Sequence, residues 1–266
     1  MMGILRRQLA PISDAGWQAI DDEARAVLET NLATRRFVDI EGPRGWECSS
    51  VNLGRVGKIK TVEGVRWGLR KVLPLVEFRV PFVVDRWSLD NLERGAEEVD
   101  LDSVREAALA AARFEEKVVY YGLRDAGIEG LVDASEHEPL AIGSDAESTA
   151  RAVADAVVSL TDVGVTGPFL LALGEQEYRR VAGDNPGYPL RQQLAKLVGT
   201  PPVYSPGLTG GLLVSLRGGD FPLTLGVDFS IGFDHVRGDK IHLYLTESFT
   251  FRVTGPEAVV VLRGAD

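Results

Sequence analysis

The stretch SVREAALAAARFEEKVVYYGLRDAG, residues 103–127, decides the fold class, because it predicts one long amphipathic helix. Apolar residues recur on one face at helical spacing. Ser103 and Glu106 form the pattern of a capping box at the start, and Gly127 supplies a stop signal. At about 1.5 Å per residue the helix, expected over 103–124, would be over ~30 Å long and could cross a domain.

Other helices and strands are predicted on both sides of this stretch. Residues 17–32 carry apolar side chains at helical spacing among acidic ones, and Ser144 with Glu147 predicts a capping box before another helix. The last third is rich in strands, expected at 212–216, 223–225, 241–245, 249–253 and 258–262. The class is therefore α+β, with long helices packed on antiparallel strands.

Residues 52–77 predict a hairpin with no two-sided core. Apolar residues such as Val56 and Val65 stand among glycines and charged residues. Such an arm needs a neighbour to cover it, because ordering its backbone costs ~1–2 kcal/mol per residue. We expect the arm, about 52–65, to pair with an adjacent subunit.

Composition excludes several classes of protein. The formal net charge is −10, and no stripe of Lys and Arg is present, so nucleic acid is not an expected partner. The apolar runs are too short to span a bilayer, and no signal peptide is visible. A single cysteine, Cys48, allows no disulfide within the chain. These features predict a cytoplasmic protein without a membrane partner.

Enzyme signatures are absent from the sequence. It has no nucleophile elbow, P-loop, dinucleotide fingerprint or zinc-protease motif. His235 and His242 could share a metal with Asp234, but their spacing matches no zinc pattern, so no metal site is predicted. No base is placed near Cys48 by the sequence, and no catalytic residue is assigned. A structural or interaction role is favoured.

The chain resembles the encapsulin family, also called linocin-like proteins, nearly end to end. The resemblance rests on short stretches that stand in the family's order: RRFVD at 35–39, WGLRK at 67–71, LDNLERG at 89–95, RGGDF at 217–221 and TESFTF at 246–251. The chain departs from the family where Thr34 replaces a common glycine and Phe233 a common tyrosine.

This resemblance implies the Hong Kong 97-type fold of tailed-phage major capsid proteins. It divides the chain into an N-terminal helix and arm of the peripheral domain (1–47), an extended loop (48–77), the peripheral domain with its spine helix (78–135), an axial domain (136–220), and return strands of both domains (221–266).

The function implied by the resemblance is that of a type 1 shell subunit. About sixty copies would assemble into an icosahedral cage, in which each copy repeats the same contacts. The cage would enclose a cargo enzyme, such as a dye-decolourising peroxidase or a ferritin-like protein, and would serve in oxidative stress or iron storage. Two alternatives stay open: a prophage capsid subunit, and a bacteriocin- or peptidase-like enzyme.

Three sites follow from the resemblance. A pocket for the cargo's C-terminal targeting peptide would be built from Arg35, Phe37, Asp39, Leu225, Asp228, Ile231 and Phe233. A loop would line the pore on the five-fold axis, with Gly183, Asp184, Asn185, Pro186, Gly187 and Tyr188. No cofactor is required, but Trp87 could stack on a flavin (FMN).

Overall fold

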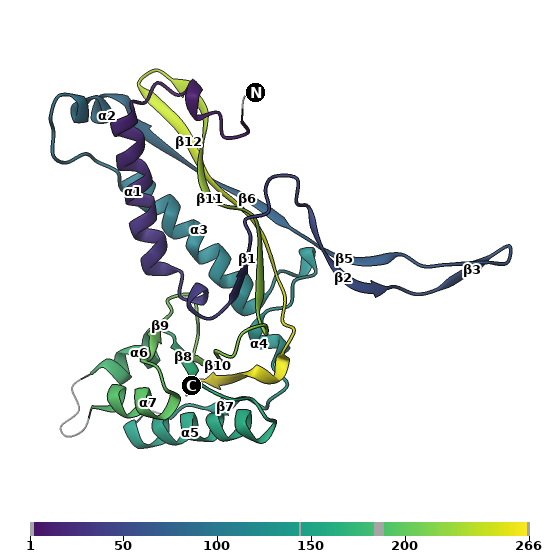
Figure 1. Ribbon diagram of the computed structural model, residues 1–266. Helices are drawn as coiled ribbons and strands as arrows, with labels where there is room; N and C mark the ends of the chain where they lie inside the picture. Colours follow the sequence, from purple (N-terminus) through teal and green to yellow (C-terminus); the bar gives the residue numbers. More distant parts are fainter. Residues whose placement is uncertain (1–2, 144, 184–188, 265–266) are drawn as a thin grey trace.

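The computed structural model describes residues 3–143, 145–183 and 189–264 of the chain. It shows two bodies, one above the other in Figure 1, and a long arm that projects sideways from them. Helices and strands both contribute to each body, which confirms the α+β prediction.

The upper body is built on a four-stranded sheet (Figure 1). Helix α3 packs on the sheet and α1 packs on α3, with aliphatic side chains such as Ile20, Val104 and Leu243 buried between them. The strands lie in the order β1 (Asp39–Glu41), β11 (Pro222–Arg237), β12 (Lys240–Phe251) and β6 (Val76–Asp85), and the helices are α1 (Asp14–Asn31), α2 (Arg86–Glu93) and α3 (Asp102–Tyr121).

The lower body is a five-stranded sheet with its own helices. It holds most of the large aliphatic core, and β8 and β10 are buried along their whole length. Its strands lie in the order β7 (Leu140–Ala141), β13 (Val259–Arg263), β10 (Gly211–Ser215), β8 (Phe169–Leu173) and β9 (Val203–Tyr204), and its helices are α4 (Leu131–Ala134), α5 (Ala146–Asp162), α6 (Glu175–Ala182) and α7 (Leu190–Val198).

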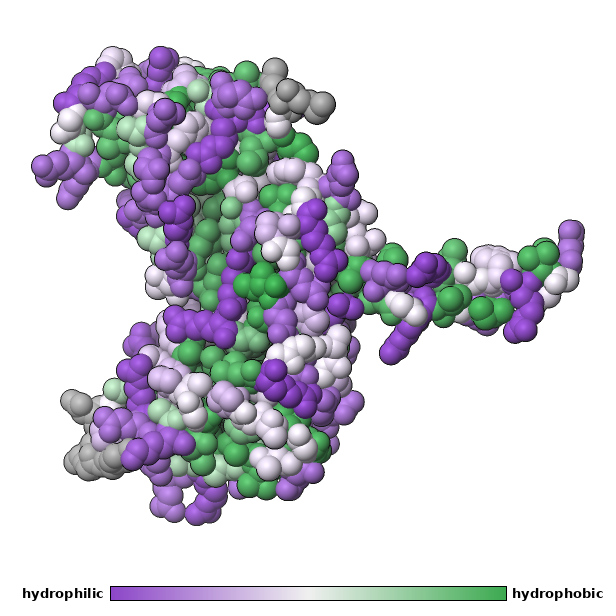
Figure 2. Space-filling model, viewed as in Figure 1, coloured by the Kyte–Doolittle hydropathy of each residue, from purple (hydrophilic) through white to green (hydrophobic). Residues whose placement is uncertain are grey.

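The arm is the hairpin that the sequence predicts. Strand β2 (Ser50–Val56) pairs with β5 (Arg70–Pro74), and β3 (Lys60–Val62) pairs with β4 (Val65–Trp67) beyond them. Apolar side chains along it face solvent, and Leu69 is 74% exposed (Figure 2). A single subunit thus leaves an apolar ribbon uncovered, which is a pattern typical of an interaction surface.

Two predicted ends of the long helix were wrong. Helix α3 begins after Leu101, and the Ser103 hydroxyl donates to the carbonyl of Val83 instead of capping the helix. The helix ends at Tyr121, before Gly122, which has a φ of 76°. Any side chain at Gly122 would collide with the backbone of Ile128, because the amide of Leu123 pairs back to that carbonyl.

Two further boundaries differ from the predictions. The capping box of α5 lies one residue later than predicted: Asp145 accepts from the amide of Ser148, whose side chain returns to Asp145, while Ser144 lies outside the described residues. The strands expected at 241–245 and 249–253 are one continuous strand, β12, because its residues 240–249 pair with β6 without a break.

A buried carboxylate connects the two bodies. Glu116 of α3 accepts from the amide and the hydroxyl of Thr34, at 2.7 and 2.5 Å. Its other oxygen lies 3.1 Å from the hydroxyl of Ser205 in the lower body, which in turn lies 2.8 Å from the hydroxyl of Tyr120. Burial raises the pKa of Glu116 to about 7, against the opposing effect of these hydrogen bonds.

Candidate functional site: a groove between a helix and a sheet edge

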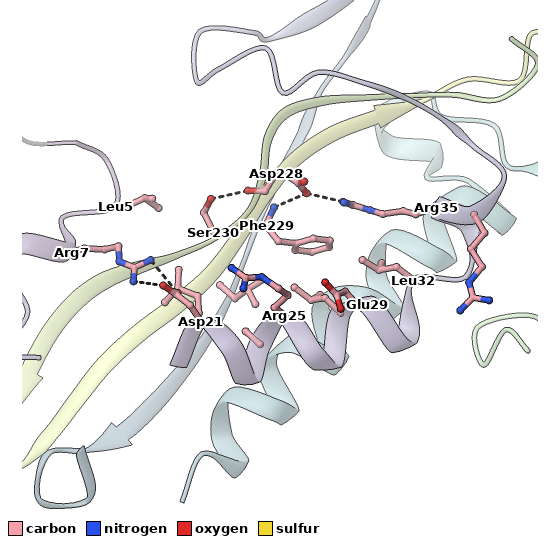
Figure 3. A pocket seen from close by; sticks show the side chains of 15 residues that line it. Leu5, Arg7, Asp21, Arg25, Glu29, Leu32, Arg35, Asp228, Phe229 and Ser230 are labelled. Carbon is pink, nitrogen blue, oxygen red and sulfur yellow. Dashed lines mark hydrogen bonds and ion pairs between the residues drawn. The ribbon is translucent and has the colours of Figure 1, made fainter. Parts of the chain in front are cut away.

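A groove of about 620 Å³ lies between α1 and β11 (Figure 3). We call it the α1–β11 groove. It is lined by Leu5, Arg7, Asp21, Ala24, Arg25, Leu28, Glu29, Leu32, Arg35, Arg36, Asp228, Phe229, Ser230, Ile231 and Leu245.

Helix α1 supplies one wall because of the spacing of its residues. Five of its side chains in the groove, from Asp21 to Glu29, recur three and four positions apart and so share one face, which Leu32 continues just after the helix ends. Ser13 fixes the start of the helix by accepting from the amide of Gly16. The apolar members form a floor, and the charged members form a rim.

The opposite wall is the edge of β11. Four consecutive residues, 228–231, line the groove, although successive side chains of a strand point to opposite faces. The groove therefore meets the strand at its edge and not at one face alone. The register of β11 with β12 shifts between Val227 and Ser230, so a β-bulge lies at this position.

Arg35 closes one end of the groove with a cluster of carboxylates. Its Nη2 lies 2.6 Å from Glu115, 2.7 Å from Glu247 and 2.9 Å from Asp228 (Figure 3 shows the last). The side chains of Glu115 and Glu247 are fully buried, whereas that of Asp228 is 44% exposed. The guanidinium also lies over the ring of Phe229, 4.8 Å from its centroid.

Burial and the nearby carboxylate of Glu115 raise the pKa of Glu247 well above its ordinary value. Oxygen Oε2 of Glu247 is buried and has no hydrogen-bond partner among the described residues. The partners of Arg35 outweigh its own desolvation and raise the pKa of its guanidinium. Arg35 is therefore a fixed charge that holds two buried acids and one exposed acid.

The N-terminal segment closes the other end. The carbonyl of Leu5 accepts from the amide of Phe233, at 2.8 Å. Arg7 donates two hydrogen bonds to Asp21, at 2.6 and 3.1 Å, and its guanidinium stacks on Trp17 (Figure 3 shows the hydrogen bonds). Residues before α1 are thereby fastened to both walls of the groove.

The lining carries four arginines and three acids, a formal balance of 4 − 3 = +1. Two of these arginines are neutralised inside the groove, Arg7 by Asp21 and Arg35 by its acids. Arg36 and Glu29 form no ion pair with any described residue. They are therefore free to meet charges of a ligand.

Three of the seven residues predicted for a peptide pocket line this groove: Arg35, Asp228 and Ile231. Phe37 and Leu225 instead lie in the subunit's core, and Asp39 accepts from the amide of Phe221 at 3.1 Å. Phe233 is partly buried against the core of the upper body. The sequence analysis did not predict the charged rim that α1 contributes. The only signal for it in the sequence is the position of these charged residues, at the border between the polar and the apolar face of the helix.

The other predicted sites lie apart from the groove. Of the pore residues, Gly183 follows α6, whereas Asp184, Asn185, Pro186, Gly187 and Tyr188 lie outside the described residues. Trp87, in the first turn of α2, is 59% exposed, and the guanidinium of Arg94 lies 5.4 Å from its ring centroid.

In the part of the chain that the structure describes, no three His, Cys, Asp or Glu side chains gather as metal ligands. Nor does any described helix have the length and apolar character needed to cross a membrane.

The fold belongs to the capsid class. A virus-like particle from Pyrococcus furiosus aligns with 92% of this chain and 98% of its own at a TM-score of 0.67 and 16% identity. The capsid of phage XM1 aligns with 88% of this chain and 92% of its own at a TM-score of 0.54 and 14% identity. The predicted Hong Kong 97-type fold is confirmed.

Comparison at the level of sequence is more specific. The family model described as "Encapsulating protein for peroxidase" matches residues 2–250. The type 1 encapsulin shell protein of Rhodospirillum rubrum is 42% identical, over 99% of this chain and 97% of its own, and that of Brevibacterium linens is 39% identical, over 98% and 99%. The chain belongs to the family of type 1 encapsulin shell proteins. It is thus a structural shell protein, not an enzyme.

Proposed function

We propose that the shell built by this protein encloses a cargo enzyme, and that a short C-terminal peptide of the cargo binds in the α1–β11 groove. One observation carries the proposal: the groove joins an apolar floor to a rim whose charges are partly unpaired. An extended peptide needs this combination, because apolar slots supply affinity and fixed charges select the sequence.

Arg35, Asp228 and Ile231 are the proposed peptide-binding residues from the predicted set, and Phe233 borders them along β11. Each buried Leu-type anchor of a peptide could contribute ~1.5–3 kcal/mol before ordering costs. A single peptide would bind modestly. Cargo with several subunits would bind much more tightly, because its peptides would engage the wall together.

A peroxidase is the favoured cargo, with a ferritin-like protein as the second candidate. The words "encapsulating protein for peroxidase" in the family description support the first. Such cargo would give the compartment a role in oxidative stress, or in iron storage if the cargo is ferritin-like. The shell would be a cytoplasmic cage of about sixty copies with closed icosahedral symmetry.

Two further sites are part of the proposal. Residues 183–188 would line the five-fold pore, where Asp184 would add a ring of negative charge that favours the passage of cations. Trp87 would stack on a flavin, and its exposed indole supports this, because an exposed ring is accessible to a ligand.

The cargo proposal is tested by filling the groove. In Ser230→Trp a large side chain occupies the lining, and His235→Trp is the control on the same strand, outside the groove. Each shell is co-expressed with two fluorescent proteins that end in the last thirty or so residues of the peroxidase or the ferritin-like protein of the same genome. We expect intact shells from both variants and loss of loading in Ser230→Trp alone. Undiminished loading in Ser230→Trp would refute the groove as the binding site.

A further inference from the structure

We infer that the cargo peptide binds as an added β-strand on the open edge of β11, held by backbone hydrogen bonds to Ile231; this inference rests on the proposed cargo function. The occupant is an extended segment of the cargo's C-terminal tail. Side chains would then set the sequence preference, while the backbone would set the register.

The edge is covered by the chain's own segments on both sides of the groove. Strand β1 pairs with residues 222–224 of β11. The next two carbonyls of β11 are also taken: that of Leu225 accepts from the amide of Arg44 at 3.0 Å, and that of Gly226 accepts from the amide of Gly45 at 2.7 Å. Further along β11, the amide of Phe233 donates to the carbonyl of Leu5. Between these contacts lies a gap of six residues, 227–232.

The direction of the backbone groups in the gap follows from the pairing with β12. Residues 230–233 pair in regular antiparallel register, in which a residue points both its amide and its carbonyl either toward the neighbouring strand or away from it. The amide of Phe233 points away, because it donates to Leu5. Ile231, two residues earlier, therefore also points both groups away from β12, into the groove.

Another amide of the gap, that of Phe229, is occupied by a side chain. Phe229 donates to Oδ1 of Asp228 at 2.8 Å, and the same oxygen accepts from Arg35 (Figure 3). Asp228 thus marks one end of the accessible edge, and Leu5 marks the other. An uncovered strand edge is a template for another strand, and the four residues between these limits, 229–232, span about 13 Å.

The floor beneath the edge defines the peptide's pattern. Leu28, Leu32 and Ile231 lie on the α1 side of the edge, and the charged rim lies around them. Because side chains of an added strand alternate, every second residue of the peptide would face this apolar floor. The segment that binds should therefore alternate apolar and polar residues over about five positions.

The test uses paired scans of the tail that loads the fluorescent protein. Each tail residue is replaced singly by alanine and by proline, because proline removes an amide without requiring any change in the shell. Strand addition predicts that proline lowers loading about five- to tenfold relative to alanine at the tail position whose amide donates to the carbonyl of Ile231. Proline effects that follow the alanine effects position by position would overturn the added strand and leave the groove proposal standing.

A second measurement uses the shell itself. Ile231→Pro removes the outward amide, which an edge strand tolerates, and Ile231→Ala loses the side chain but keeps that amide. We expect about five- to tenfold less loading in the proline variant. If Ile231→Pro does not assemble, hydrogen exchange of the amides of residues 226–234 is measured in unaltered shells with and without cargo. Protection that appears only in loaded shells supports the added strand. Equal protection in empty shells means that a neighbouring subunit covers the edge, which overturns the added strand. Failure of both tails to load unaltered shells would instead overturn the cargo proposal, and this inference with it.

Discussion

Nη2 of Arg35 lies 2.7 Å from Oε1 of Glu247, although the two residues are 212 positions apart and the side chain of Glu247 is fully buried. The same nitrogen lies 2.6 Å from Glu115 of α3. One cation therefore joins the segment after α1 to α3 and to β12. In a buried cluster of this kind, removing one partner leaves a charge that neither water nor another group can satisfy.

The first prediction concerns this cation. Arg35→Met should lower the free energy of unfolding by about 3–5 kcal/mol, because Glu115 and Glu247 lose their counter-charge. Arg36→Met is the matched control, since Arg36 is exposed and has no ion pair among the described residues; its effect should stay within about 0.5 kcal/mol. The readouts are soluble yield, shell yield and thermal unfolding. Equal behaviour of the two variants would contradict a structural role for the Arg35 cluster.

The second prediction concerns pH and Glu116. Its pKa is about 7 in the folded protein, above the ordinary value of 4.5, so the folded state holds a proton that the unfolded state releases. This contribution to stability is fully present below about pH 4.5, falls as pH rises and is lost above about pH 7, amounting to about 3 kcal/mol at most.

Glu116→Gln imitates the protonated carboxyl, because its amide can still accept from Thr34 and can donate to Ser205. We expect the variant to unfold at a higher temperature than the unaltered protein at pH 8 and to match it near pH 5. The melting temperatures of the variant and of the unaltered protein are measured across pH 5–8.5, and their difference is taken at each pH. Groups that titrate in both proteins, including those at subunit interfaces, then contribute equally and cancel. A difference independent of pH would exclude Glu116 as the titrating group.

The third prediction concerns the arm. Strands β2 and β5 are paired up to Val56 and Arg70, so residues 57–69 can be replaced by an Asn-Gly turn that closes a two-residue hairpin. The shortened subunit should fold, because the removed segment is exposed, yet it should form no closed shell. Glu63→Ala, at the tip turn, is the control and should assemble normally. Light scattering and negative-stain microscopy distinguish the outcomes, and normal shells from the shortened chain would refute the arm's role in assembly.

The fourth prediction concerns flavin. Shells incubated with flavin mononucleotide and desalted should keep flavin absorbance, whereas Trp87→Leu shells should be colourless, because an aliphatic side chain offers no ring for stacking. Trp46→Leu, which removes another exposed indole, should retain the colour. Colourless unaltered shells would count directly against a flavin at Trp87.

Local patterns were sufficient to predict α1, the long helix α3 and the arm, because hydrophobic spacing and glycine content act within a few residues. They did not show that Phe37 and Leu225 lie in the core. Apolar residues in a strand or after a helix fit a pocket and a core equally well, and only the path of the whole chain separates the two.

The groove depended still more on tertiary structure. Arg35, Glu115 and Glu247 stand in three separate parts of the sequence, and no local signal brings them together. The open edge of β11 exists because β1 is only three residues long and the N-terminal segment returns near Phe233. Strand length was predictable only approximately, and the gap between two covering segments was not predictable at all.

The position of β13 has a consequence for the synthesis of the protein. This strand lies between β7 and β10 in the lower sheet, yet it follows β11 and β12 of the upper body along the chain. While the ribosome is still making the upper strands, the lower sheet lacks the strand that joins β7 to β10, so β7 has no neighbour in the sheet. A partly synthesised chain therefore lacks a complete lower sheet. Subunits become competent to join a shell only after nearly all their strands have been translated.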